Sequence, residues 1–182
     1  MPRLPDLDPA TLDAEQKRIH DEIVSGPRGK VEGPLRVWLT SAGLADKAQA
    51  LGAFCRYGTS LPTRLSELAI LVTGAHWQAG FEWHVHAPIA LAAGLDPVAV
   101  EKIRVGAEPE FANDDEKAVY AFSRELLTKR RVSDATYAYA DKILGSHALV
   151  DLVGVLGYYG LISMTINAFD VPLPPGSKEP FA

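Results

Sequence analysis

The chain has 182 residues, 47% of them hydrophobic and 23% charged, which predicts one globular domain with a sizeable core and excludes a disordered chain. A formal net charge of -5 and the shortness of the basic run at 129–131 argue against a nucleic-acid partner. The single cysteine, Cys55, excludes an intramolecular disulfide and a dithiol redox centre within one chain.

Apolar residues recur at helical spacing along most of the chain, so we expect an all-α fold. A first helix is predicted to begin at Asp8-Pro9 or at Thr11, with Ile19 and Ile23 on its apolar face. A glycine- and proline-rich loop over 25–34 follows. Two further helices are expected over 35–41 and 44–57.

The middle of the chain predicts two helices joined by one glycine. The first covers 63–79 and the second 81–94, with Gly80 as the break and Gly94 as the stop signal. Such an αα-hairpin places the segment "GFEWHVHAP", residues 80–88, at its bend.

The second half predicts a short helix from Asp96-Pro97 and a helix that a capping box over 113–116 would start. Two more follow, over 133–145 and from Ser146 to about Phe169, before an extended, proline-rich tail. Asp151 inside the long apolar helix favours a buried core helix over a membrane span. The polar N-terminus lacks the apolar region of a signal peptide, so we expect a cytoplasmic protein without a membrane partner.

The spacing of Glu82 and His86 is the strongest chemical signal. Residues four apart on a helix share a face, and a carboxylate beside an imidazole can exchange a proton near neutral pH. The hairpin could bring Glu67 of the preceding helix to the same pair. Two carboxylates and a histidine suit separate acid and base roles. The competing interpretation is an ordinary surface ion pair.

A metal site is a second interpretation of the same segment. Glu82 and His86 with His84 or His76 would make two histidines and one carboxylate, although the spacing matches no metal motif. We therefore expect no metal at this segment.

Several neighbouring residues are candidates for substrate binding. Trp77, Phe81 and Trp83 could form an apolar pocket wall or belong to the core, and His84 faces away from the Glu82–His86 pair. Arg64 could hold a substrate carboxylate or pair with Glu67 or Glu82.

Two other features have a structural and a functional interpretation. Cys55 is either a small buried hydrophobic residue or a reactive thiol. Gly154, Gly157 and Gly160 form a stripe that suits close helix packing, within the subunit or between subunits.

The segment "RLSELAILVTGAHWQAGFEWHVHAPIALAAGL" resembles the core hairpin of the carboxymuconolactone decarboxylase family, within the alkylhydroperoxidase D-like superfamily. The matching positions are Arg64, Glu67, His86 and 92–95. The resemblance implies that 1–182 is a single domain with the alkylhydroperoxidase D-like helical fold and a central αα-hairpin carrying the site. It divides the chain into an N-terminal helical extension and loop over 1–34, a core over 35–169 and a tail over 170–182.

The family has two versions of the site. The peroxidase version has a Cys-x-x-Cys motif before the histidine, and its two positions are Ala79 and Glu82 here, so both cysteines are missing. The decarboxylase version has Glu and His four apart, which Glu82 and His86 match. The chain departs from short decarboxylases in its N-terminal extension and tail, as a longer branch lacking Cys-x-x-Cys does.

The resemblance implies a cofactor-free lyase for a carboxylated lactone or related ring acid. His86 would donate or accept the proton, with Glu82 and Glu67 supporting it and Arg64, Trp83, Trp77 and His84 near the substrate. It also implies a homo-oligomer, a trimer or hexamer. The alternatives are a peroxidase-like oxidoreductase using Cys55 and a non-catalytic, oligomeric small-molecule binding protein.

Overall fold

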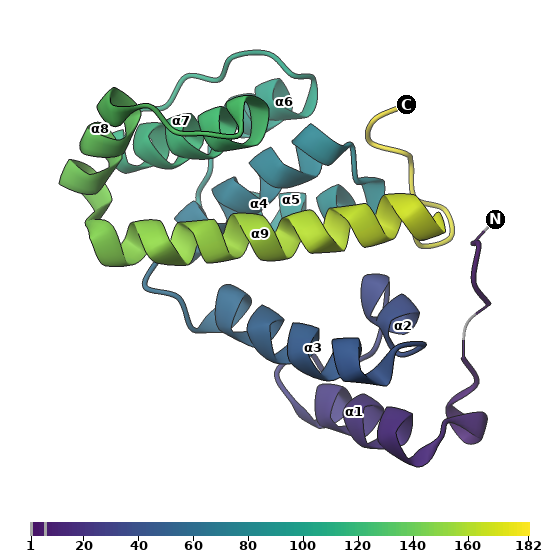
Figure 1. The fold of residues 1–182 in the computed structure, drawn as a ribbon. Coiled ribbons are helices and arrows are strands. Elements are labelled where there is room, and N and C mark those ends of the chain that lie inside the picture. The colour runs from purple at the N-terminus through teal and green to yellow at the C-terminus, as the bar shows by residue number, and fades with distance from the viewer. Residues whose placement is uncertain (1, 6) are drawn as a thin grey trace.

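The computed structural model describes residues 2–5 and 7–182, and all regular secondary structure in these residues is helical (Figure 1). After a 3-10 turn at Pro9–Thr11, the helices are α1 (Ala14–Ser25), α2 (Pro34–Trp38), α3 (Ala42–Tyr57), α4 (Thr63–Trp77), α5 (Gly80–Ala92), α6 (Pro97–Arg104), α7 (Asp114–Lys129), α8 (Asp134–Leu144) and α9 (Ser146–Phe169).

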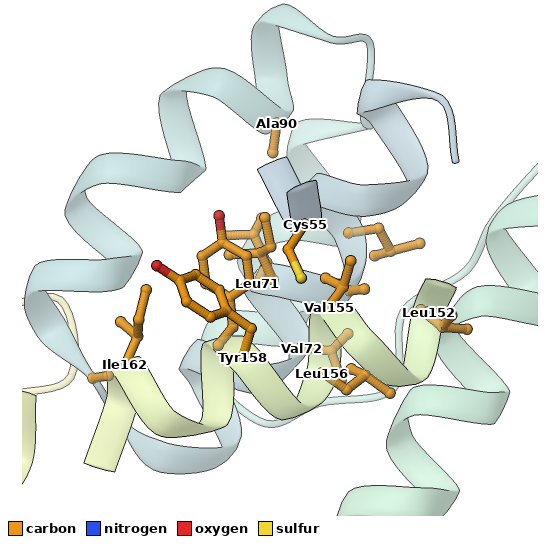
Figure 2. Packing of buried hydrophobic residues seen from close by; sticks show 14 of the residues in the cluster. Cys55, Leu71, Val72, Ala90, Leu152, Val155, Leu156, Tyr158 and Ile162 are labelled. Atoms are coloured by element: carbon orange, nitrogen blue, oxygen red, sulfur yellow. The ribbon is translucent and has the colours of Figure 1, made fainter. Parts of the chain in front are cut away.

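The long helix α9 forms the centre of the fold. It lies between α3 on one side and the α4–α5 hairpin on the other (Figure 1). Val155, Leu156 and Tyr158 project from it into the core, where they meet Leu71 of α4 and Cys55 of α3 (Figure 2). Its length and composition would allow it to cross a membrane, but 67% of its most apolar window is buried in the protein, as predicted for a core helix.

Polar contacts join α9 to α2 and to the loop between α3 and α4. The indole of Trp38 donates to the hydroxyl of Thr165 at 2.9 Å. Asp151, the acidic residue inside the apolar helix, accepts from both the backbone N–H and the hydroxyl of Ser60 at 2.8 and 2.7 Å. These bonds offset the cost of burying the polar groups.

The first α-helix begins later than predicted. Asp8 caps only the separate turn Pro9–Thr11, and α1 starts at Ala14. The reason is a capping box: Asp13 accepts from the Gln16 backbone, and the Gln16 side chain accepts from the Asp13 N–H. Ile19 and Ile23 are buried as predicted.

The hairpin reverses at a different residue from the one predicted. Gln78 adopts the left-handed conformation, with φ of 50°, and Gly80 is the first residue of α5 rather than a break between the helices. A β-carbon at Gly80 would meet only the carboxylate end of the Glu179 side chain in the tail.

The capping box predicted over 113–116 does not form. Asn113 makes no side-chain cap, and its amide instead donates to Glu116 at 3.1 Å. Glu116 is also paired with Arg64 of α4, so a contact between distant helices replaces the local one. The starts of α6, α8 and α9 lie where predicted.

The tail after α9 is extended, as predicted, and folds back onto α5. The Phe181 ring packs edge-on against Trp83 with centroids 5.4 Å apart, and Arg104 donates to the carbonyl of Pro180. At the other end of the chain, the Arg3 N–H donates to the Phe169 carbonyl at 3.0 Å. Both ends of the chain consequently lie near the C-terminal end of α9 (Figure 1).

Candidate active site

Three acid–base side chains meet in the α4–α5 hairpin. His86 Nδ1 lies 2.7 Å from Glu67 Oε2, and His86 Nε2 lies 2.9 Å from Glu82 Oε1. All three side chains are at most 5% exposed. The pair is thus part of a buried cluster and not the surface ion pair that its spacing alone also allowed.

The hairpin explains why these three groups meet. Glu82 and His86 are four residues apart on α5 and share one face of it. Glu67 is on the face of α4 that packs against α5, with its neighbours Leu68 and Ala69 also buried. The contact between Glu67 and His86 therefore depends on helix packing, across 19 residues of sequence.

The two contacts of the His86 ring are chemically different. Nδ1–H donates an aligned hydrogen bond to Glu67, which orients the ring. Glu82 Oε1 is close to Nε2 but is not aligned for a hydrogen bond, and this buried oxygen has no other partner among the described residues. Glu82 keeps acceptor capacity that a substrate could use.

Burial of the ring would lower the pKa of His86, but the charge of Glu82 and the hydrogen bond to Glu67 outweigh it and raise the pKa to about 9. His86 is therefore an imidazolium at neutral pH. Tyr159 covers the ring edge-on at a centroid distance of 5.1 Å. Burial and the nearby Glu82 raise the pKa of the Tyr159 hydroxyl, which keeps this neighbour uncharged.

A cavity of about 270 Å³ adjoins the cluster. Glu82 and His86 both line it, together with Phe81 and Tyr159, whereas Glu67 does not. Glu67 thus supports the ring from behind while Glu82 and His86 face the space that a small molecule could enter. A larger cavity of about 520 Å³, between α2 and the tail, shares Glu32 and Phe81 with this one but holds none of the cluster.

The other predicted substrate-binding residues lie elsewhere. Arg64 does not pair with Glu67 or Glu82; it pairs with Asp115 at 2.7 Å and with Glu116, both on α7. Trp83 is buried against Phe181, and His84 is exposed. Trp77 is 36% exposed beside His76, so of the three aromatic residues only Phe81 lines the cavity.

The metal interpretation finds no support in the geometry. Both nitrogens of His86 already face carboxylates, and His76 and His84 are exposed. Within residues 2–5 and 7–182, no group of three His, Cys, Asp or Glu side chains has an arrangement that could hold a metal ion.

Cys55 is the only cysteine, and it is fully buried among the core residues of α3, α4 and α9 (Figure 2). Burial and the nearby Asp151 raise the pKa of its thiol to about 11. It does not line the cavity.

Three cationic residues of the cavity were not predicted. Arg28 and Lys30 come from the loop before α2, and Arg56 comes from the last turn of α3. The available sequence signal was weak: Arg28 and Lys30 lie in a glycine- and proline-rich loop, and such loops often carry binding residues.

No protein-family model matches the chain, and no curated protein matches its sequence. Solved structures do match. An uncharacterized peroxidase-related protein from Ralstonia eutropha JMP134 with an alkylhydroperoxidase AhpD core gives a TM-score of 0.77 at 15% identity, over 99% of this chain and 94% of that one. An uncharacterized peroxidase-related protein from Silicibacter sp. TM1040 gives a TM-score of 0.74 at 15% identity, and the match covers 96% of this chain and 92% of that one.

The debrominase Bmp8 is also similar, with a TM-score of 0.73 at 13% identity over 93% of this chain and 91% of that one. The chain therefore has the alkylhydroperoxidase D-like helical fold, as predicted, and the proteins that share this fold include an enzyme. At these identities the likeness defines the fold, and function must be argued from the site.

Proposed function

We propose that this protein is a cofactor-free lyase that removes CO₂ from a carboxylated lactone or a related ring acid. The observation that carries the proposal is the buried His86, held by Glu67 and facing a cavity together with Glu82. This arrangement supplies a charged proton donor, a carboxylate that can share the proton transfer and a cavity that a small molecule could enter.

The chemistry needs only these groups, because an unsaturated lactone can accept electrons itself. The bond between the ring and the carboxylate breaks, CO₂ leaves, and the electron pair moves into the conjugated carbonyl as a dienolate. His86 then delivers one proton to the ring carbon, and the imidazole regains a proton from solvent, a transfer that the carboxylate of Glu82 can share. Glu67 holds the imidazole in position throughout, so it is a positioning residue.

Peroxidase-like chemistry at Cys55 has less support. It requires an accessible thiolate, and the Cys55 thiol is buried with a raised pKa. We expect the thiol titre of the native protein to be unchanged by peroxide. A loss of that titre, prevented in Cys55→Ser, would favour the oxidoreductase.

The non-catalytic alternative, an oligomeric small-molecule binding protein, would use the same cavity without turnover. Location in the cytoplasm and assembly into a trimer or hexamer also belong to the proposal. The expected assembly rests on the family resemblance of the hairpin.

The test is CO₂ release from 4-carboxymuconolactone by purified, metal-stripped protein. We expect turnover that His86→Ala and Glu82→Gln reduce by about 10²–10⁴-fold. Glu67→Gln should retain more activity and should shift the pH profile, because it changes only the support of the ring. Full turnover in His86→Ala would contradict the assignment of roles, and absence of release by the folded protein would exclude this substrate.

A further inference from the structure

The cavity beside His86 contains two arginines that form no ion pair with any carboxylate of residues 2–5 and 7–182. Arg28 and Arg56 both line it, from different elements of the chain. Elsewhere among the described residues, Arg18, Arg64 and Arg104 each form ion pairs with aspartate or glutamate. Lys30, the third cation of the cavity, is paired with Glu32 at 2.7 Å, so those two charges cancel.

Arg28 is fixed in place by neutral contacts. Its Nη2 donates to the Tyr158 hydroxyl at 3.2 Å, while its Nε is buried without a hydrogen-bond partner. A β-carbon at Gly52 would overlap both Arg28 and Tyr158, so this glycine makes the room for their contact. A buried guanidinium N–H without a partner is costly unless a ligand accepts from it.

Arg56 is also held by a neutral group. Its guanidinium lies 5.5 Å from the centre of the Tyr57 ring, and within the described part of the chain no carboxylate pairs with it. A planar guanidinium that is oriented by an aromatic ring and free of a carboxylate is well suited to bind an incoming carboxylate through two parallel hydrogen bonds.

The charges of the cavity favour an anion. With His86 protonated between Glu67 and Glu82, that cluster carries one net negative charge. Arg28 and Arg56 add two positive charges, which leaves an excess of one.

We propose that Arg28 and Arg56 bind the carboxylate that the substrate keeps, and so select ring acids that carry a second acidic group. The identity of the reaction rests on the proposed function, but the binding of the anion does not. A carboxylate that is bound by two arginines is stabilised in its charged form, so it is not the group that leaves as neutral CO₂. The carboxylate that leaves must therefore lie on the Glu82–His86 side, where the carboxylate of Glu82 favours its departure as neutral CO₂.

The N-terminal segment would then take part in binding the substrate. Arg28 belongs to 1–34, which the sequence suggested to be an extension outside the core. In the structure, Arg28 is one of the two arginines that line the cavity. The binding of an acidic substrate would therefore depend on the loop between α1 and α2.

The test compares the binding of 2-furanacetate with that of the uncharged 2-furanacetamide, by calorimetry and ligand-observed NMR. We expect the wild-type protein to prefer the acid, and Arg56→Gln and Arg28→Gln each to weaken acid binding roughly 10-fold or more while amide binding stays the same. The matched control is Arg131→Gln, an exposed arginine outside the cavity, which should change neither.

Two further measurements distinguish a failure of anion binding from a failure of the proposed lyase activity. His86→Ala should still bind the acid in an arginine-dependent way, even if it releases no CO₂. If Arg28→Gln disturbs Tyr158 and fails to fold, Arg56→Gln still tests whether an arginine of the cavity binds the acid. Equal binding of acid and amide by the wild-type protein, no measurable binding of the acid, or unchanged binding in a folded Arg56→Gln would overturn the inference, whatever the CO₂ assay shows.

Discussion

His86 connects the energetics of folding with the chemistry of the site. Its ring is buried between two carboxylates, and their attraction keeps it charged where burial alone would make it neutral. The same contacts that hold the proton for catalysis therefore also stabilise the folded protein when the proton is bound.

This coupling predicts how stability depends on pH. The folded pKa of His86, about 9, lies above its ordinary value of 6.5, so its contribution is fully present below pH 6.5 and is lost as pH rises through 9. The shift corresponds to about 3 kcal/mol in the free energy of unfolding. Urea denaturation at pH 6.5 and 9.5 should show this loss in the wild-type protein and not in His86→Gln. Equal pH dependence in both proteins would contradict it.

Arg64 illustrates which residue roles sequence can and cannot predict. The spacing of Glu82 and His86 was readable because a helix places residues four apart on one face. The partners of Arg64 could not be predicted from the sequence, because Asp115 and Glu116 reach Arg64 only through the packing of α7 on α4. Arg28 and Arg56 are hidden for the same reason, since no local pattern joins a loop to the end of α3.

We therefore predict that Arg64 acts in stability. Arg64→Gln leaves the nearly buried Glu116 without its ion pair and should cost about 1–3 kcal/mol in the free energy of unfolding. At a temperature where the variant is folded, kcat and KM should be unchanged. A large rise in KM without a loss of stability would instead return Arg64 to the substrate.

Helix α3 supports the site through a glycine. A β-carbon at Gly52 would overlap Tyr158 and Arg28, and Tyr158 is itself buried and in contact with Trp38 and Tyr159. We predict that Gly52→Ala destabilises the protein by about 1–3 kcal/mol through overpacking. Gly43→Ala in the same helix is the control, because a β-carbon there meets nothing and should be neutral or stabilising by less than about 1 kcal/mol. Similar melting temperatures for both variants would rule out this close packing.

At the scale of elements, sequence predicted the order of the helices and most of their ends. The errors occurred where local signals compete. Asp8 and Asp13 both can cap a helix, and the Gln16 side chain decides in favour of Asp13. Gly80 looked like the turn residue, but Gln78 takes the left-handed conformation, which is uncommon for a residue with a side chain.

At the scale of the whole molecule, the exposed side of α9 is a candidate surface for contact between subunits of the expected homo-oligomer. Val150 and Val153 are 71% and 47% exposed, and β-carbons at Gly154 and Gly157 would meet nothing within the subunit. The glycine stripe therefore does not serve close packing inside the chain at these two positions. Its alternative role, contact with a second copy, remains the prediction.

Sedimentation velocity can test that prediction. We expect the wild-type protein to sediment as a trimer or hexamer, and Val150→Lys with Val153→Lys to shift it toward monomer. Val98→Lys is the matched control, since this valine is 61% exposed on α6. A wild-type protein that is monomeric at every concentration would contradict the expected assembly.

The central claim is that His86 is an imidazolium held between Glu67 and Glu82 beside a substrate cavity. The most direct measurement is an NMR titration of the His86 ring in the native protein, with His86→Gln used to assign the signal. The account predicts a ring that stays charged through neutral pH and titrates near pH 9. A ring that titrates at or below its ordinary 6.5 would contradict the claim, because the carboxylates would then not hold the proton on which the proposed chemistry depends.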